Sequence, residues 1–480
     1  MKKLLIGFLA VGLVMGFALT ASAQPNLKAS GQLYLYGTYA DNPSLLKNGD
    51  SRANIANRLR MQFEIQVQEG LKLTTRFDAL ERVWGENAAA AAPSPTGSTE
   101  TSAAIATERN ISWERAYVTF NALYGVFDVG YQPSRVWGTC AFCDDFDSDA
   151  GIHYRYMMGP WTFGLEYEKR AGNDAALGLG SSGEGSRQGG YTVGGTDNDH
   201  DVYHVYAIYR WATGQAGLRY EFDRNATDGA QGGPALRVRP ERHGRRAGGS
   251  RAAPEWTYSF HELAPYLQWA MGPFSIEAEL RYIWGKIDVD GANPDIDRKG
   301  WSLYLNPKYT MGAFYGGLEF AYITGDDPST TDKIEAGVQG GQVWDPLLMY
   351  GNYWFSKHQA ILGQVRNNLG AFVNNIPATA AGGNELNLIM FKPYVGWVVN
   401  PQLSIVAQFA WLKADEKPAG FVDDDYGREF DIYANYKIYN NLTYTVGFGY
   451  FWTGDYFKGN NPNANVDDTF LVMNALNFAF

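Results

Sequence analysis

The sequence predicts an all-β protein, a transmembrane antiparallel β-barrel of about eighteen strands. Three features predict it: long segments in which apolar and polar residues alternate, connections of alternating length, and an apolar leader at the N-terminus. Such barrels have short periplasmic turns and long extracellular loops. About sixteen strands would remain if two weak segments are not strands, and about twenty would result if the stretch 324–385 contains a hairpin around 343–355. Residues 356–369 could instead form a short helix in the lumen.

The segment 54–84 shows the alternation most clearly. Odd positions from Ile55 to Val67 are apolar except Asn57, and even positions from 58 to 68 carry Arg, Gln or Glu. After the two-residue turn at 69–70, the chain returns with the same alternation. Strands with one apolar and one charged face suit a bilayer crossing of about 9–11 tilted residues. The alternative is an edge hairpin of a large soluble sandwich.

The remaining strands follow in order, mostly as pairs joined by tight turns. A single strand at 33–39 precedes the opening hairpin, and one at 468–480 closes the chain. The pairs are 111–122 with 126–132, 152–158 with 162–170, 202–211 with 215–223, 258–270 with 274–284, 301–310 with 314–323, 386–399 with 403–412, and 428–439 with 442–452. Every second connection is short and often contains Gly or Pro, which are typical turn residues. A soluble sandwich has no reason to sort its connections in this way.

The N-terminus has the features of a secretory signal peptide. Lys2 and Lys3 precede an apolar run from 4 to 19, and the small residues at 21–23 form a cleavage site. We therefore expect a signal peptide at 1–23 and a single domain at 24–480. Export combined with barrel strands indicates the outer membrane of a Gram-negative bacterium, where lipid and lipopolysaccharide surround the protein.

Composition and charge agree with a barrel and argue against other classes. Aromatic residues make up 15% of the chain and the mean hydropathy is −0.30, far below that of a helical membrane protein. The net charge is −11, and removal of the leader takes it to −13. An acidic chain is a poor partner for nucleic acid and attracts cations.

The last strand carries an assembly feature. Phe478 and Phe480 stand at alternate positions at the end of its apolar face. A terminal Phe on such a strand resembles the signal by which the barrel-assembly machinery recognises bacterial outer-membrane proteins. We therefore expect Phe478 and Phe480 to act in assembly.

Two adjacent strands resemble the general porins of Gram-negative bacteria. In that family a strand with Arg-Ala-aromatic precedes a Gly turn and a strand reading Val-Gly-Arg-Gln. The corresponding stretches here are 114–120 and 124–132, with Tyr131 where the family commonly has Arg. The resemblance implies a water-filled channel for passive diffusion of small polar solutes or ions, a homotrimer, and a following loop that narrows the pore. That loop corresponds to residues 133–150, while about eighteen strands match substrate-specific or alginate-export-like barrels better.

Alternate residues of each strand face the lumen, and we call this alternation strand parity. The charged positions are expected to face inward, because a charge on the lipid face costs about 2–4 kcal/mol near the midplane. Two interpretations of these charges stay open: they pair and stiffen the wall, or they set up a transverse field that selects solutes. The expected pore-lining residues are Arg58, Arg60, Arg76, Arg82, Arg115, Arg155, Glu166, Glu168, Glu277 and Glu279, and the same parity adds Glu64, Arg219, Arg281, Glu429 and Asp431.

The candidate constriction loop has its own chemistry. Cys140 and Cys143 are the only cysteines, and an oxidising periplasm favours a local disulfide between them. Four carboxylates follow closely, and if the loop folds inward they face the arginines of the opening hairpin. A solvated surface loop is the alternative. The acidic residues are Asp144, Asp145, Asp147 and Asp149.

Other functions have weaker support in the sequence. His153, His204 and His261 lie on strands, so a barrel lipase or protease is conceivable, but no Gly-x-Ser-x-Gly motif occurs. A structural or adhesin barrel with a plugged lumen is a third class. The Asp-rich loops lack the ligand spacing of a calcium loop, so we expect no metal and no cofactor.

One segment departs from the rest of the chain. Residues 234–254 contain six Arg, many Gly and Ala, and a single acid, Glu241. A basic outer loop that binds lipopolysaccharide phosphates is one interpretation. A compensated frameshift is the other, and the change in composition favours it slightly.

Overall fold

A computed structural model describes residues 25–45, 47–84, 111–171, 199–226, 256–289, 295–338, 340–341, 344–351 and 387–480. The expected signal peptide, the Arg-rich segment and the expected helix at 356–369 lie outside these residues.

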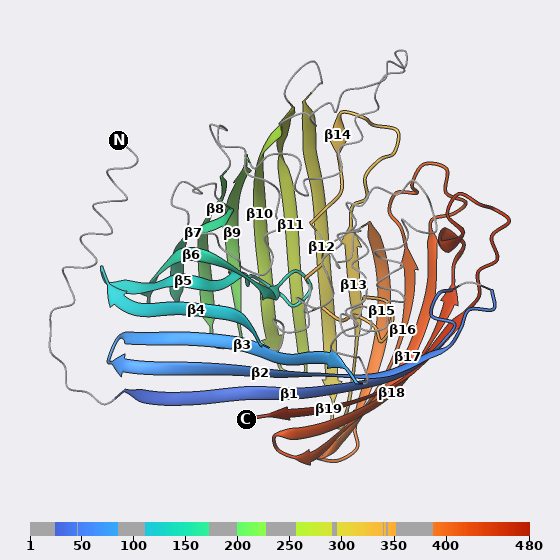
Figure 1. Ribbon diagram of the computed structural model, residues 1–480, viewed down its shortest axis with the longest axis horizontal. Coiled ribbons are helices and arrows are strands. Elements are labelled where there is room, and N and C mark those ends of the chain that lie inside the picture. Colours follow the sequence, from blue (N-terminus) through green and yellow to red (C-terminus); the bar gives the residue numbers. More distant parts are fainter. Residues whose placement is uncertain are drawn as a thin grey trace, which may run out of the picture.

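Eighteen long antiparallel strands form the barrel, as the alternation and the turns predict. They are β1 (Asn26–Asp41), β2 (Arg52–Gln68), β3 (Leu71–Val83), β4 (Ile111–Ala122), β5 (Gly125–Arg135), β6 (Asp144–Met158), β7 (Trp161–Ala171), β8 (His200–Trp211), β9 (Gly214–Asn225), β10 (Trp256–Met271), β11 (Phe274–Val289), β12 (Ile296–Met311), β13 (Phe314–Ile323), β15 (Leu388–Val398), β16 (Leu403–Lys413), β17 (Asp425–Tyr439), β18 (Leu442–Thr453) and β19 (Thr469–Ala479). Each strand pairs with its neighbours in chain order (Figure 1).

Two further elements lie in the connections. The two-residue strand β14 (Lys333–Ile334) pairs in parallel with β12 and does not join the barrel wall. The 3-10 helix η3 (Asp455–Lys458) follows β18. The described residues 344–351 form no hairpin, so they do not add the two strands that a barrel of twenty would need. No described helix has the length and apolar character needed to span a bilayer.

The first and last strands close the barrel. β1 pairs with β2 on one side and with β19 on the other. Gly31 and Phe480 exchange both backbone hydrogen bonds, at 2.9 and 3.0 Å. A Cβ at Gly31 would lie 2.7 Å from the tip of the Phe480 ring and 2.9 Å from the Arg60 carbonyl oxygen, so the strands pack closely here. Residue 480 is therefore part of the closure.

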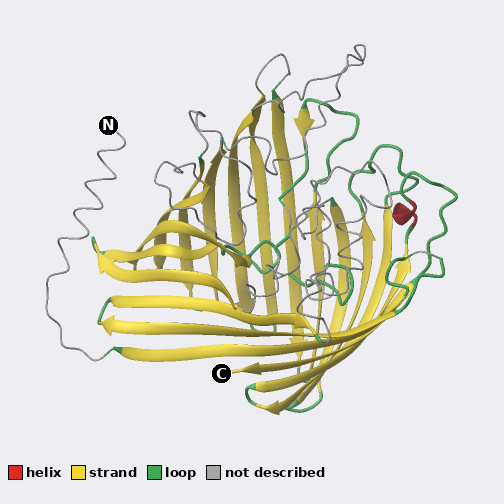
Figure 2. Cartoon of the chain, viewed as in Figure 1, coloured by secondary structure: helices red, strands yellow, loops and turns green. Residues whose placement is uncertain are grey.

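Connections at the two ends of the barrel differ in length. At one end, the turn end, strands meet through tight connections such as Glu69-Gly70 and Gly159-Pro160, where both glycines have positive φ. At the other end, the loop end, the strands are joined by longer stretches of chain, such as 454–468 between β18 and β19, which is described and drawn in green and red in Figure 2. The tight turns predicted from the sequence are thus confirmed at the turn end.

The two faces of the wall differ in chemistry. Large apolar side chains are exposed on the outer face, and aromatic pairs occur near both ends of the strands, such as Trp161 with Tyr209 and Trp301 with Tyr322. Aromatic residues at these levels suit the two interfaces of a bilayer. The opposite face carries the charged residues and surrounds the lumen.

A β-bulge makes the predicted position of Arg82 wrong. The register between β2 and β3 shifts at Leu80, which has a φ of +54°. Beyond the shift Arg82 stands opposite Asn57, and Leu59 on the outer face stands opposite Ala79. Because side chains alternate between the two faces of a strand, one inserted residue moves each later side chain to the opposite face. Arg82 therefore lies on the outer face and does not line the lumen.

Candidate functional site

The first inward segment, residues 136–143, runs from the end of β5 across the lumen to the far wall. Trp137 packs between Tyr206 and Tyr266, with ring centroids 5.2 and 5.1 Å away, and its indole N–H donates to the Ala264 carbonyl at 2.9 Å. Its ring also lies under the Arg219 guanidinium, 5.6 Å from the centroid. These contacts place residues 136–143 inside the barrel, as expected for an inward-folding loop.

A carboxylate on the wall holds the next residues of this segment. Thr139 donates both its backbone N–H and its hydroxyl to Glu279 Oε2, at 2.5 and 2.8 Å. Gly138 has a φ of +74°, and a Cβ there would lie 2.2 Å from the same oxygen. Glu279 faces the lumen as predicted, but it binds the inward segment instead of facing water.

The second inward segment consists of the described residues within 335–351. Leu348 donates its backbone N–H to Asp431 at 3.1 Å, while Met349 and Tyr350 donate theirs to Glu429 at 2.8 and 2.9 Å. Both carboxylates are fully buried. They face inward as predicted, and their role is to anchor this segment.

A second set of contacts holds the same segment to β13 and β15. The Trp344 indole N–H donates to Glu319 Oε1 at 2.8 Å, and Lys392 lies 2.6 Å from Glu319 Oε2. Lys392 Nζ also donates to the Pro346 carbonyl at 2.6 Å. Sequence reasoning missed Glu319 and Lys392, although both stand at lumen-facing positions in their strands.

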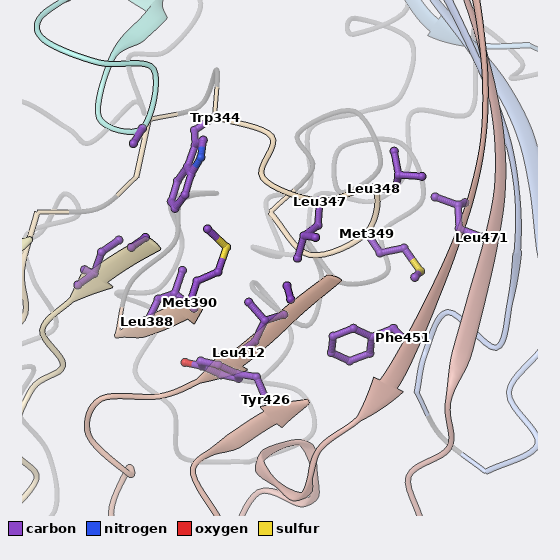
Figure 3. Packing of buried hydrophobic residues seen from close by; sticks show 14 of the residues in the cluster. Trp344, Leu347, Leu348, Met349, Leu388, Met390, Leu412, Tyr426, Phe451 and Leu471 are labelled. Atoms are coloured by element: carbon purple, nitrogen blue, oxygen red, sulfur yellow. The ribbon is translucent and has the colours of Figure 1, made fainter. Parts of the chain in front are cut away.

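The two inward segments meet inside the barrel. Gly341 donates its backbone N–H to the Ala141 carbonyl at 2.7 Å. Their apolar side chains pack with lumen-facing residues into one buried cluster, part of which Figure 3 shows around Trp344, Leu348 and Met349. The lumen beside β12–β19 is therefore filled by protein, so the free passage is narrower than the barrel.

Basic and acidic side chains pair on the wall formed by β2, β3 and β4. Arg60 binds Asp78 through two hydrogen bonds of 2.7 Å, and Arg58 lies 3.6 Å from the same carboxylate. Glu114 accepts from Arg60 at 3.3 Å and from Arg76 at 3.0 Å. Arg115 is also buried on this face, and a register shift between β3 and β4 brings Glu114 in beside it. These ion pairs hold the arginines of this wall in place.

An ion-pair network continues around the wall from β7 to β11. Arg281 lies 2.5 Å from Glu279 and 2.6 Å from Glu262, and Arg219 lies 3.3 Å from Glu262. Arg219 also pairs with Glu221 at 3.2 Å. The network then reaches a cluster around His204, in which Glu166 and Glu168 lie as predicted on the lumen face. Paired charges stiffen the wall, as one interpretation of the sequence expects.

A cavity of about 650 Å³ opens at the turn end of the lumen. Residues from β8 to β15 line it, including Gln268, Glu277, Asn306 and Lys308. Glu277 is partly exposed there. Arg155, nearer the same end on β6, is also partly exposed and pairs with Asp128 at 2.5 Å.

Two expectations for the loop 133–150 differ from the structure. No disulfide joins Cys140 to Cys143 in the structure, and Cys140 Sγ instead lies 3.8 Å from the Tyr304 hydroxyl on the far wall. Burial raises the pKa of the Cys140 thiol to about 11. The inward residues 136–143 carry no charge.

The four carboxylates follow this segment and belong to β6, which begins at Asp144. Asp144 pairs with Arg135 in the strand register, because β5 and β6 extend further than the alternation predicted. Of these carboxylates, Asp149 lies 3.3 Å from Arg170 on the neighbouring strand. The backbone of these residues thus belongs to the wall strand β6, while the inward segment 136–143 contributes bulk to the lumen.

Comparisons with known proteins identify one family. The model of the Gram-negative porin family matches residues 10–371. Similar solved structures include OpdQ of Pseudomonas aeruginosa (12% identity, 95% of this chain and 98% of that chain, TM-score 0.48) and the outer membrane channel DcaP of Acinetobacter baumannii (12%, 96% and 99%, 0.41). A BenF-like porin from Pseudomonas fluorescens Pf-5 is similar too (10%, 95% and 98%, 0.48). No curated protein sequence matches.

The family match covers about three quarters of the chain. It agrees with a closed barrel of eighteen strands, an apolar outer face and a charged lumen narrowed by inward segments. The chain therefore belongs to the Gram-negative porin family and is an outer-membrane channel for passive diffusion.

Proposed function

We propose that the two inward segments set the size limit of this channel and that the charges of the wall set its ion preference. The observation that carries the proposal is the contact of the two segments inside the barrel, where Gly341 binds Ala141 at 2.7 Å. A backbone hydrogen bond between loops from distant parts of the chain supports a fixed narrowing. Small polar or charged solutes would pass beside it.

The distribution of charge supports a field within this passage. The wall of β2–β4 carries Arg58, Arg60, Arg76 and Arg115 against Asp78 and Glu114. The wall of β6–β9 carries an excess of carboxylates around His153 and His204. Only β5 separates these two parts of the wall, so the proposed field runs along this side of the lumen, where charges beside low-dielectric walls interact more strongly than in bulk water. Cations and anions would therefore follow different parts of this wall.

Deletion of residues 137–142 tests the size limit. We expect a severalfold higher single-channel conductance in planar bilayers and faster swelling of liposomes in larger sugars. A deletion of the same length at 460–465, in a connection at the loop end, is the matched control and should leave both unchanged. If the 137–142 deletion folds and conducts like the wild type, this segment does not limit the passage.

We further propose that His204 and His261 serve no lipase or protease chemistry. His261 lies on the outer face, where its ring accepts or donates a 2.6 Å hydrogen bond with Tyr220, and His204 lies between Glu166 and Glu221. This arrangement supports a structural role for both side chains. Hydrolysis of lipid or peptide substrates that stops on a single His change would contradict the proposal.

The remaining proposals concern biogenesis and partners. We propose that residues 1–23 are a leader that is cleaved, and that the barrel-assembly machinery inserts the chain by recognising Phe478 and Phe480. We also propose that the loop end contacts lipopolysaccharide and that the protein is a homotrimer. Only the porin resemblance supports the trimer. Mass determination of the mature chain and its mobility in native gels test the leader and the oligomer.

A further inference from the structure

A cluster of three side chains in the lumen takes no part in holding either inward segment. His153 on β6 stands opposite Glu166 on β7, and Glu168 follows two residues later on the same face. One ligand atom from each side chain lies within 4.8 Å of the other two. His153 Nε2 is 3.6 Å from Glu168 Oε1, and His153 Nδ1 is 3.8 Å from Glu166 Oε1.

Two buried atoms of this cluster are without a hydrogen bond among the residues the structure describes. They are His153 Nε2 and Glu168 Oε1, and their residues are only 9% and 0% exposed. Buried polar atoms almost always have a partner in native proteins. The two atoms face each other across 3.6 Å, which is longer than an N–H···O hydrogen bond. A ligand between them would satisfy both.

Neighbouring residues already hold the other carboxylate oxygens. Glu166 Oε2 lies 3.0 Å from His204 Nδ1, and Glu168 Oε2 accepts from Arg170 at 3.1 Å. His204 is in turn fixed by Glu221 at 2.9 Å. Each glutamate thus has one oxygen bound to a neighbour and the other turned toward His153. Outer partners of this kind orient metal ligands in proteins.

We propose that His153, Glu166 and Glu168 bind a divalent transition cation of the zinc class. One imidazole nitrogen and two carboxylate oxygens are ordinary zinc ligands, and tetrahedral zinc sets such ligand atoms about 3.4 Å apart. The gap of 3.6 Å between His153 and Glu168 needs little adjustment. Calcium and magnesium prefer sites made of oxygen alone, so the imidazole favours a transition metal.

The site is open to the lumen on one side. The side chains of Glu166 and His153 keep 17% and 11% of their surface exposed, whereas that of Glu168 lies behind them. A cation in the passage can therefore reach the cluster, and a water or solute can fill the fourth position. The two carboxylates supply the negative charge that a divalent cation requires.

Zinc titration of the full-length, tag-free protein in detergent tests the proposal, with isothermal calorimetry as the readout. We expect one site that binds more tightly than the rest. His153→Ala should weaken it by more than about 100-fold, because loss of an outer partner alone costs about 10–100-fold. His261→Ala, on the outer face of β10, is the matched control and should leave the affinity unchanged.

Three results of the titration would overturn the proposal. One is zinc affinity retained in His153→Ala, another is affinity lost equally in His261→Ala, and the third is a wild type without a tight site. Glu166→Gln, whose amide oxygen can still accept from His204, is a second variant if His153→Ala does not fold. X-ray absorption of the zinc-loaded wild type should show an imidazole in the first shell, and its absence there would also refute the assignment.

Discussion

Trp137→Ala should release the first inward segment from the far wall. The indole ring packs between Tyr206 and Tyr266, and its N–H binds the Ala264 carbonyl. Truncation of a packed Trp to Ala costs about 3–5 kcal/mol, which includes the cavity that remains. Since about 1.4 kcal/mol corresponds to a factor of ten, a loss of 3 kcal/mol raises the undocked population by about 100-fold or more.

Single-channel recording in planar bilayers measures this change directly. The open current of Trp137→Ala should fluctuate between levels, and its mean should rise toward that of the 137–142 deletion. Trp137→Phe keeps most of the ring contact and loses one hydrogen bond of about 1 kcal/mol, so its noise should increase only slightly. Trp397→Ala, at an outer-face ring that packs on Phe314, is the control. Equal current noise in Trp137→Ala and wild type would refute the proposed anchoring.

Three further predictions follow from single positions. Deletion of Phe480 removes the backbone pairing with Gly31 and should reduce the heat-modifiable fraction in outer-membrane preparations, whereas normal mobility would contradict its role in closure. Because the pKa of Cys140 is raised to about 11, its thiol stays protonated at pH 8. In a Cys143→Ser variant, the alkylation rate of Cys140 should therefore rise with pH up to about pH 11. A plateau near pH 9 would contradict the raised pKa. Arg82→Gln should leave the reversal potential in a KCl gradient unchanged, since Arg82 lies on the outer face, while Arg60→Gln should raise cation preference.

The fold could be predicted from the sequence because its signals are local. Alternation at period two identifies a strand from its own residues, and turn residues such as Gly272-Pro273 mark the tight connections without knowledge of the partner strand. The bounds of 111–122 and 314–323 agree with β4 and β13. The strands at the loop end extend beyond the alternation, as β6 does from Asp144, because backbone pairing continues where the side-chain pattern has ended.

The lumen could be predicted only in part, because its contacts join residues far apart in the chain. Parity correctly placed Glu279, Glu429 and Asp431 inside, but it gave no sign that their partners are backbone N–H groups of two loops. The apolar Trp137 within a loop was an available signal for burial. The adjacent Ala79 and Leu80 likewise broke the alternation just before Arg82, where the bulge reverses the faces.

Asp78 gives the last prediction, because one carboxylate holds two arginines in the wall of β2–β4. Its side chain is 4% exposed, and it lies 2.7 Å from Arg60 and 3.6 Å from Arg58. Asp78→Asn removes this negative charge, and breaking a buried pair costs about 3–5 kcal/mol because an uncompensated charge remains. We expect a lower unfolding midpoint in urea and a reversal potential shifted toward anion preference.

The double variant Asp78→Asn with Arg60→Gln separates these two effects. It removes one charge of each sign, so the wall regains its net charge and the reversal potential should return toward that of the wild type. The double variant should lose less free energy of unfolding than the two single variants lose together, because residues in one ion-pair network are coupled by about 0.5–3 kcal/mol. Additive losses would mean that Asp78 and Arg60 act independently. The arginines would then owe their positions to the strand register, and the pairing observed in the lumen would contribute little to the stability of the wall.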